Sequence, residues 1–268
     1  MGIPLSVAII TFNEEKNIRR CLTSLGDLAD EILVVDSFST DSTKKICAEF
    51  GVRFVEHPFS GHKEQKNHAI SLARYDHILS LDADEALDPT LQNEIEKVKQ
   101  KWKAHAYTFN RLTRYGQQWI FHCGWYPNRR VRLFDRRKAR WQGPHEGSSL
   151  HERIETDPDA LVAHLPGHLL HYSFSSISEH VQKTDTYTTI AAQEAFKRGK
   201  RTHLYDFLRA PWQFFRDYIV RRGFLDGEMG LTICAVNALY VFLKYSKLRI
   251  LANPPKVSEC TDRNGRDP

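Results

Sequence analysis

The stretch ILSLDADE, residues 78–85, is a short apolar run that ends abruptly in acidic side chains. A run bounded in this way is typical of a buried strand whose last residues leave the sheet. Two carboxylates, Asp82 and Asp84, then stand at its carboxyl end, which is where α/β sheets bind ligands. They could hold a hard divalent cation that keeps positions open for water and phosphate. Taken alone, the pair is equally typical of a solvated acidic turn.

Three strand-like segments precede this stretch, and helical segments alternate with them. Residues 5–10, 31–36 and 53–56 have the composition of strands, and Asn13 is placed to cap the first helix. Alternation over about ninety residues predicts an α/β fold with a doubly wound, mostly parallel sheet. Residues 89–100 are expected to form an amphipathic helix that packs on the core.

Acidic residues recur where the predicted strands end. Glu14, Asp36, Asp82 and Asp84 all fall at or just past such an end, so one crevice of a parallel sheet would collect them. Any one of them could instead be a helix cap or a surface acid. Neither glycine-rich phosphate loop is present, so a bound diphosphate would need a metal and basic side chains. The aspartate pair and Lys66 meet that requirement.

The composition sets wide limits on the partners of the chain. With 268 residues and 41% hydrophobic content it can bury a full core. A net charge of +5 permits a nucleotide, a phospholipid surface or a nucleic acid as partner. The 5 cysteines are widely spaced and form no C-x-x-C pair, which favours a reducing compartment over a disulfide framework or zinc site. The first apolar segment lacks a basic region before it, so we interpret it as a strand rather than a signal peptide.

Three blocks together resemble family 2 glycosyltransferases of the GT-A fold: SVAIITFNEE at 6–15, EILVVDS at 31–37 and DADE at 82–85. The resemblance implies a nucleotide-sugar site. Asp82 would lie near the ribose, and Asp84 would ligate Mg²⁺ or Mn²⁺ bridging the two phosphates. The resemblance also implies that Asp36 accepts a hydrogen bond from the uracil ring. The other positions that it implies in nucleotide binding are Thr11, Asn13, Glu14 and Lys66.

The block GWYPNRRVRLF, residues 124–134, mixes aromatic and guanidinium side chains. Such a mixture could stack on sugars, bind single-stranded nucleic acid or form only a basic strand edge. It resembles the acceptor-facing half of bacterial lipopolysaccharide core glucosyltransferases. That resemblance implies an acceptor-binding role for Trp125, Tyr126, Arg129 and Arg132.

An inverting transfer needs a carboxylate that takes the proton from the attacking hydroxyl. Glu146 and Glu152 each follow a histidine, whereas the core transferases carry a single His-Glu block followed further on by a Leu-His pair. The spacing to His171 favours Glu152 and leaves Glu146 as the alternative. His171 is a candidate third metal ligand, although a lone histidine is more often structural.

The last third of the chain changes character. Residues 176–198 are expected to be helical, and residues 211–222 alternate aromatic and basic side chains, which favours contact with a membrane surface. The apolar helix at 229–245 is predicted to be too short to span a bilayer, which needs about 20 residues. It would be buried against the catalytic domain or lie at the membrane interface. We expect three regions: a GT-A domain at 1–175, a helical membrane-proximal region at 176–252 and a flexible tail at 253–268.

The sequence therefore predicts a metal-dependent, inverting glycosyltransferase at the cytoplasmic face of the inner membrane. It would move a hexose, glucose from UDP-glucose, onto an inner-core saccharide of lipopolysaccharide or onto another lipid-linked or cell-surface glycan. A nucleic-acid-binding module is the non-enzymatic alternative. It would leave Asp36, Asp82 and Asp84 without a role, because carboxylates in a phosphate-binding groove repel the ligand.

Overall fold

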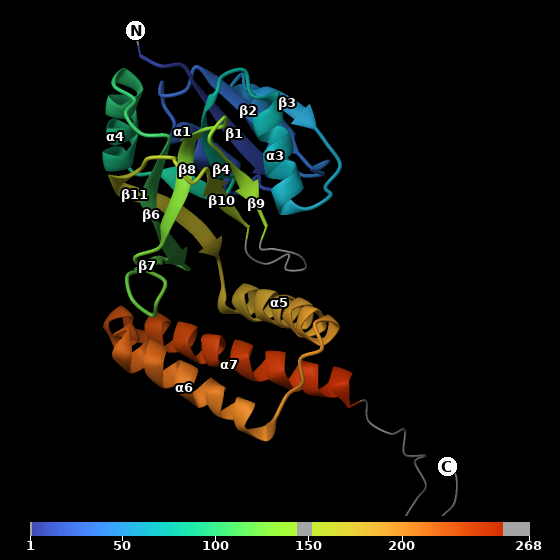
Figure 1. Cartoon of the computed structure of the whole chain (residues 1–268). Helices are drawn as coiled ribbons and strands as arrows, with labels where there is room; N and C mark the ends of the chain where they lie inside the picture. Colours follow the sequence, from blue (N-terminus) through green and yellow to red (C-terminus); the bar gives the residue numbers. More distant parts are fainter. Residues whose placement is uncertain (1, 144–151, 254–268) are drawn as a thin grey trace, which may run out of the picture.

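The structure, a computed structural model, describes residues 2–143 and 152–253. A nine-stranded sheet with helices on both faces forms the N-terminal part, and a group of helices lies beyond one end of it (Figure 1). The predicted α/β fold with a C-terminal helical segment is confirmed.

The first half of the sheet is parallel, as predicted. Its strands are, in spatial order, β3 (Arg53–Glu56), β2 (Glu31–Asp36), β1 (Leu5–Thr11) and β4 (His77–Asp82). The helices that connect them are α1 (Ile18–Thr23), α2 (Thr43–Glu49) and α3 (His62–Leu72). The central strands β1 and β4 are nearly continuous apolar runs because helices cover both of their faces.

The second half of the sheet mixes parallel and antiparallel strands. Its strands are β8 (Arg129–Asp135) next to β4, then β6 (Ala106–Tyr115), β11 (Val162–Phe174) and β5 (Glu85–Leu87), with β7 (Gln118–Ile120) beside β6. Only β6 and β11 run parallel to each other in this half. A separate two-stranded sheet consists of β9 (Ala139–Gln142) and β10 (Arg153–Thr156). The strand order reverses between β1 and β4, which is where a ligand crevice is expected.

Alternate side chains of the strands fill two cores, one on each face. Val7 and Ile9 point toward α1 and α4 (Pro89–Gln100), whereas Ala8 points toward α3. The predicted inward face of α4 is confirmed, with Leu91, Ile95 and Val98 all buried. Each such apolar side chain contributes about 1.5–3 kcal/mol when it is fully buried.

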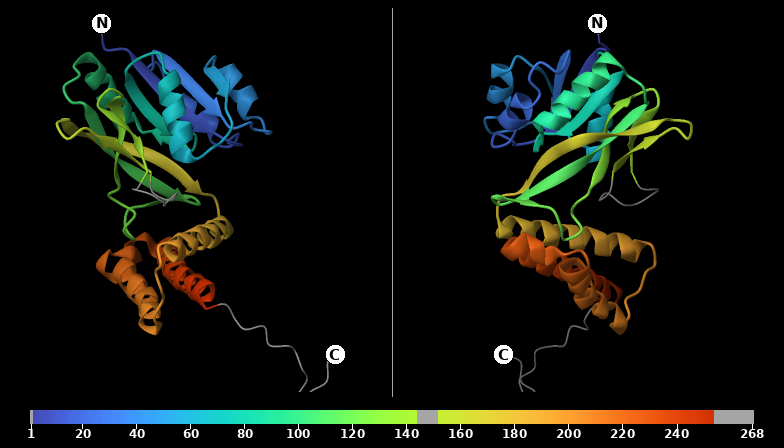
Figure 2. Two further views of the ribbon diagram at one scale, coloured as in Figure 1. Left: turned by 45° about the vertical axis from the view of Figure 1, so that its right-hand side comes forward. Right: turned by 90° about the vertical axis from the view of Figure 1, so that its left-hand side faces the viewer.

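The C-terminal helices form a group of their own below the sheet (Figures 1 and 2). They are α5 (Ile177–Lys197), η1 (Leu204–Leu208), α6 (Arg209–Phe215), the π-helical η2 (Arg216–Val220), η3 (Gly223–Asp226) and α7 (Gly227–Ala252). α7 packs mainly on α5 and α6, and it contacts the N-terminal part through Met229, Ile233 and Cys234 and through the carbonyl of Gly230, which accepts a hydrogen bond from Cys123 Sγ. The prediction that it is too short to cross a membrane is wrong, since residues 223–252 pass that test by length and composition. A core helix of a soluble protein passes the same test.

A buried carboxylate, Asp226, joins the two parts. Its side chain accepts hydrogen bonds from the backbone N–H groups of Phe121 and His122, at 3.3 and 2.8 Å, and from Nδ1 of His122. β11 ends at Phe174 and α5 begins at Ile177, close to the expected boundary. The division into a catalytic domain and a helical region remains a prediction, and residues 254–268 of the expected tail lie outside the described residues.

Candidate active site

The ends of three parallel strands bring the predicted acids to one edge of the sheet. Thr11 pairs with Asp36 across β1 and β2, and Ile10 pairs with Asp82 across β1 and β4. Burial raises the pKa of Glu14; the hydrogen bond to Asn17 opposes the shift, and the charge of Asp84 adds to it. The carboxyl ends of these strands therefore bring together acids from separate parts of the chain.

The loops that follow β1 and β2 hold each other in place. The backbone N–H of Asn13 donates to Ser39 Oγ at 2.8 Å, and Asn13 Oδ1 accepts from the N–H of Thr40 at 2.8 Å. The prediction that Asn13 caps the first helix is wrong, because Asn17 occupies that position and Asn13 has a left-handed φ of 53°. Asparagine tolerates this conformation better than most residues.

Asp36 is almost fully buried at this junction. Its two carboxylate oxygens accept hydrogen bonds from the backbone N–H and the hydroxyl of Ser39, at 2.7 and 2.5 Å. Thr11, beside it, is also buried, and its hydroxyl has no partner among the described residues. A role of Thr11 and Asp36 in contacting the base of a nucleotide remains a prediction.

Asp82 is held by two cations. Lys66 Nζ lies 2.9 Å from one carboxylate oxygen, and Arg132 Nη2 lies 2.9 Å from the other. Burial alone would raise the pKa of Asp82, but the charges and hydrogen bonds of Lys66 and Arg132 outweigh it and hold that pKa well below its usual range. Asp82 is therefore ionised, and its charge is already matched by side chains, which does not fit the predicted role as a metal ligand.

Asp84 faces a histidine from the other half of the sheet. His171 Nε2 lies 3.3 Å from an Asp84 oxygen, and His171 Nδ1 lies 3.4 Å from the hydroxyl of Thr113. The antiparallel pairing of β11 with β5, which aligns His171 with Glu85, produces this contact. Within residues 2–143 and 152–253, no three side chains of the metal-binding types gather into a preformed site. A metal held by Asp84 and His171 would need its other ligands from outside these side chains, and the metal role of both residues remains a prediction.

Lys66 also links Glu152 to Asp82. Lys66 Nζ lies 2.7 Å from Glu152 Oε1, so one buried ammonium joins Glu152 to Asp82. The ring of Trp141 supports this ammonium, with 4.3 Å between Nζ and the ring centroid. The alternative base, Glu146, lies outside the described residues.

The four predicted acceptor residues have different surroundings. Trp125 packs against Phe174 and His180 where the sheet meets the helices. The hydroxyl of Tyr126 lies 3.1 Å from Nε2 of His168. Arg129 is exposed at the start of β8, whereas Arg132 is only 3% exposed. Since Arg132 is enclosed between carboxylates, direct contact with an acceptor does not fit its position.

Two residues of the site, Glu85 and Trp141, were not predicted from the sequence. Glu85 is buried and accepts a hydrogen bond from Arg132 at 2.7 Å and one from the backbone N–H of Asp82 at 3.0 Å. The sequence did contain an indication of this role of Glu85, since an acid in a buried apolar segment requires a partner. Trp141 supports both Lys66 and Arg132, and its Nε1 donates to Ser80. No local sequence pattern predicts that Trp141 contacts these two cations, because the contact forms where β9 packs against α3.

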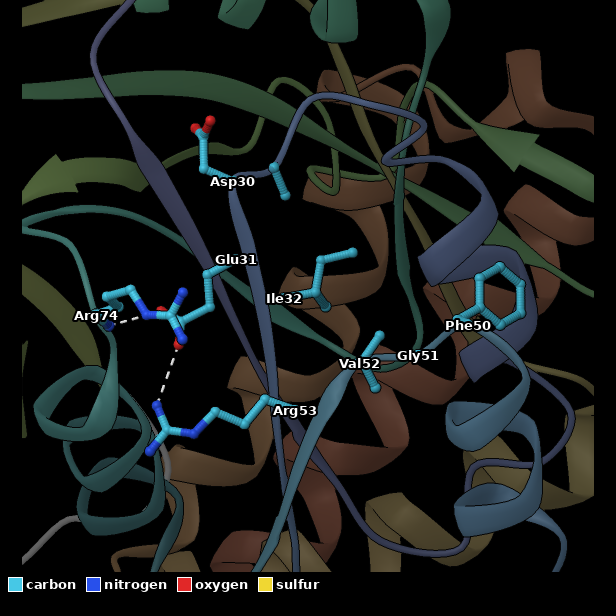
Figure 3. Close-up of a pocket in the computed structure, with 9 residues that line it drawn as sticks. Asp30, Glu31, Ile32, Phe50, Gly51, Val52, Arg53 and Arg74 are labelled. Carbon is cyan, nitrogen blue, oxygen red and sulfur yellow. Dashed lines mark hydrogen bonds and ion pairs between the residues drawn. The ribbon is translucent and has the colours of Figure 1, made fainter.

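A shallow cavity of about 230 Å³ lies elsewhere, at the start of β2 (Figure 3). Glu31 there accepts hydrogen bonds from the hydroxyl of Ser6, from the backbone N–H of Arg74 and from Arg53 at 3.1 Å. Its carboxylate is thus satisfied within the chain. The cavity adjoins the opposite end of the strands from Asp36 and Asp82, so we interpret it as structural.

The chain is similar in sequence to known glycosyltransferases. The sequence profile described as Glycosyl transferase family 2 matches residues 6–150. An uncharacterized glycosyltransferase of Rickettsia bellii (strain RML369-C) is 31% identical over 256 residues, covering 92% of this chain and 87% of its own. The lipopolysaccharide core biosynthesis glycosyltransferase LpsC of Rhizobium meliloti (strain 1021) is 29% identical over 257 residues, 92% of each chain.

Solved structures were compared as well. TarS residues 1–349 of S. aureus has a TM-score of 0.47 and 12% identity, over 97% of this chain and 95% of that one. Glucosyl-3-phosphoglycerate synthase from Mycobacterium tuberculosis, solved with Mn²⁺, uridine diphosphate and glucosyl-3-phosphoglycerate, has a TM-score of 0.35 and 25% identity. That match covers 42% of this chain and 45% of the synthase.

Proposed function

Because this chain belongs to glycosyl transferase family 2, we propose that it transfers a hexose, glucose from UDP-glucose, to an inner-core saccharide of lipopolysaccharide with inversion at the sugar. Membership of the family makes it an enzyme of the GT-A fold that uses a nucleotide-sugar donor. The relative LpsC, a lipopolysaccharide core biosynthesis glycosyltransferase that matches over 92% of each chain, supports this acceptor class. Another lipid-linked or cell-surface glycan is the alternative acceptor.

The observation that carries this proposal is the meeting of Glu14, Asp82 and Asp84 at one sheet edge, with Glu152 joined to them by Lys66. In this scheme the interlocked loops after β1 and β2 bind the nucleoside. Asp82, fixed by two cations, accepts a hydrogen bond from the ribose. Separate elements thus hold the donor and the attacking hydroxyl in a fixed position relative to each other. This is how positioning of the reactants raises the reaction rate.

Asp84 and His171 would hold Mg²⁺ or Mn²⁺ at the diphosphate of the donor. A divalent ion there supplies positive charge that stabilises the departing diphosphate. The contact of His171 Nδ1 with Thr113 directs Nε2 toward Asp84, as a supporting contact does for metal-binding histidines.

We assign the role of base to Glu152. Lys66 holds Oε1 at 2.7 Å, so the proton of the acceptor hydroxyl would pass to Oε2. The hydroxyl oxygen then attacks the anomeric carbon as the bond from that carbon to the diphosphate breaks. A positioned base contributes about 10²–10⁴ to the rate of such a step.

Matched glutamine variants test the base. Glu152→Gln should keep the affinity for UDP-glucose and lose about 10²–10⁴ of the transfer rate to a core oligosaccharide. The control is Glu155→Gln, on the same strand segment but paired with Arg153 at the surface, which should retain full activity. A severe loss in Glu146→Gln combined with a mild one in Glu152→Gln would transfer the role to Glu146.

The helical part supports a second element of the proposal, contact with an anionic membrane surface. α6 lies on the side of the helical group that faces away from the sheet (Figures 1 and 2). Large apolar side chains are exposed along η1, α6, η2 and α7: Leu204, Leu208, Trp212, Val220, Phe242 and Ile250. Burial lowers the pKa of Lys244, and the charges of Lys200 and Arg209 add to the shift, so cations gather among these apolar groups. Apolar anchors together with cations are the features that bind an anionic lipid surface.

A further inference from the structure

An arginine cluster lies beside the proposed active site, in the half of the sheet that does not bind the nucleotide. Arg130 on β8 stands opposite Phe109 on β6, and Arg111 follows two residues further along β6. Burial lowers the pKa of Arg130, and the charges of Arg111 and Arg132 lower it further, whereas Glu85 opposes the shift. Three guanidinium groups are thus close enough to repel one another.

The carboxylates nearby do not balance this cluster. Glu85 Oε1 lies 2.7 Å from Arg132 and 3.8 Å from Arg111, so one acid serves two arginines. Asp82, the other acid, is shared between Arg132 and Lys66. The guanidinium of Arg130 forms no hydrogen bond or ion pair with any residue that the structure describes, and Arg130 is exposed to solvent.

Several donors in the cluster point at no acceptor. Nε of Arg111 and both Nε and Nη1 of Arg132 are buried without a partner among the described residues. Arg132 as a whole is only 3% exposed. Buried donors of a charged group are costly to leave unpaired, and clustered like charges add to that cost. An anion bound at Arg130 and Arg111 would offset the repulsion between the clustered charges.

The position of the arginine cluster indicates which substrate would supply the anion. Thr113, two residues beyond Arg111 on β6, contacts His171, the partner of Asp84. The arginines therefore adjoin the diphosphate side of the site. They come from β6 and β8, whereas the nucleotide loops follow β1 and β2.

We propose that the saccharide acceptor carries an anionic group, a phosphate or a carboxylate, that binds between Arg111 and Arg130. The inference rests on the proposed function, since it names the chemical class of the acceptor for that same site. Guanidinium groups bind both anions through paired N–H donors, which fixes the orientation of the ligand as well as its charge. The anion would place the acceptor hydroxyl against Glu152, on the opposite side of Asp82 from the nucleoside.

The test compares a charged and a neutral sugar on the full chain. Binding of glucose 6-phosphate and of glucose is measured by calorimetry at constant ionic strength in a phosphate-free buffer, with Mn²⁺ and UDP present. We expect the wild-type protein to bind glucose 6-phosphate at least tenfold more tightly than glucose. Arg130→Gln and Arg111→Gln should each remove most of that difference. Because Arg130 reaches solvent, its replacement should leave the fold intact.

The matched control is Arg140→Gln, an exposed arginine on β9 outside the site, which should bind both sugars as the wild type does. Loss of UDP-glucose affinity in Arg130→Gln, equal to the loss for glucose 6-phosphate, would assign the arginines to the donor diphosphate and overturn the proposal. Unchanged binding of glucose 6-phosphate in both variants would show that the cluster is structural. Failure of the wild-type protein to bind UDP-glucose with Mn²⁺ would instead contradict the proposed function itself.

Discussion

At the scale of single residues, the site is a chain of charges in which each member is held by a partner from another element. Asp82 from β4 contacts Lys66 from α3 and Arg132 from β8, and Lys66 continues to Glu152. The sequence showed Asp82, Lys66 and Glu152 as separate candidates. It could not show that they touch, because the three lie far apart along the chain.

Replacement of Asp84 tests the metal site. Asp84→Asn should reduce the transfer rate more than tenfold and abolish the Mn²⁺-dependent rise in melting temperature that UDP produces, because the carboxylate is the only charged ligand proposed. Asp159→Asn, a surface acid paired with Lys138, serves as the control. Retention of more than about a tenth of the activity in Asp84→Asn would count against the metal role.

Replacement of Lys66 tests the charge chain. Lys66→Met leaves two carboxylates facing each other without their shared cation, which should lower the free energy of unfolding by on the order of 3 kcal/mol. Lys63→Met, on the same helix, removes a surface pair with Glu64 and should cost less than about 1 kcal/mol. Urea unfolding of both variants at neutral pH measures the difference, and equal losses would contradict a special role for Lys66.

At the scale of elements, β11 connects the active site to the helices. It carries His171 in the site and Phe174 at the aromatic contact with α5. The sequence analysis did not predict this strand, which contains Pro166 and Gly167 in its middle. The structure places them at a bulge, where Gly167 has a φ of +93° and an added Cβ would lie 2.5 Å from the backbone nitrogen of Leu91. A bulge of this kind is typical of a strand that bends around a neighbouring element.

The contact of α5 with the sheet should depend on pH. Burial lowers the pKa of His180 to about 4, and the charge of Lys183 adds to the shift; Tyr115 contacts its Nδ1 at 3.2 Å. In the unfolded chain this histidine binds a proton below about pH 6.5, whereas in the folded chain it does not until about pH 4. The stability is therefore complete above pH 6.5 and falls as the pH is lowered, by at most about 1.4 kcal/mol per pH unit.

Urea unfolding between pH 7.5 and pH 5 measures this dependence. His180→Gln should flatten it, because glutamine does not titrate and can still bond to Tyr115. The control is His164→Gln, an exposed residue on β11. An unchanged slope in His180→Gln would show that other groups govern the acid sensitivity.

At the scale of the whole molecule, the helical group shapes both the active-site edge and the outer surface. Lys183 on α5 is close enough to Glu14 to influence its pKa, so the helices border the loop that follows β1. On the far side, the exposed apolar side chains of η1 and α6 have no partner within the described residues that would cover them. A membrane on that side would leave the catalytic edge close to the lipid surface, where a lipid-linked acceptor stands.

Vesicle binding tests this orientation. Leu208→Glu, at a side chain that is 70% exposed on η1, should weaken binding to anionic phospholipid vesicles by about tenfold, because it removes one apolar anchor and adds a repelled charge. Leu161→Glu, at a side chain that is 58% exposed on the catalytic part, should bind as the wild type does. Co-sedimentation measures both, and equal binding by the two variants would contradict this docking surface.

The sequence by itself determined the parallel half of the sheet, the acids at its edge and the family, because these depend on short patterns: apolar runs, strand-end carboxylates and three motif blocks. Only the tertiary structure decided which charges meet. It enclosed Arg132 between Asp82 and Glu85, brought His171 to Asp84 and gathered Arg111 with Arg130. Those contacts depend on strand order and register between segments distant in sequence, and register is set by the packing of the whole core rather than by any local pattern.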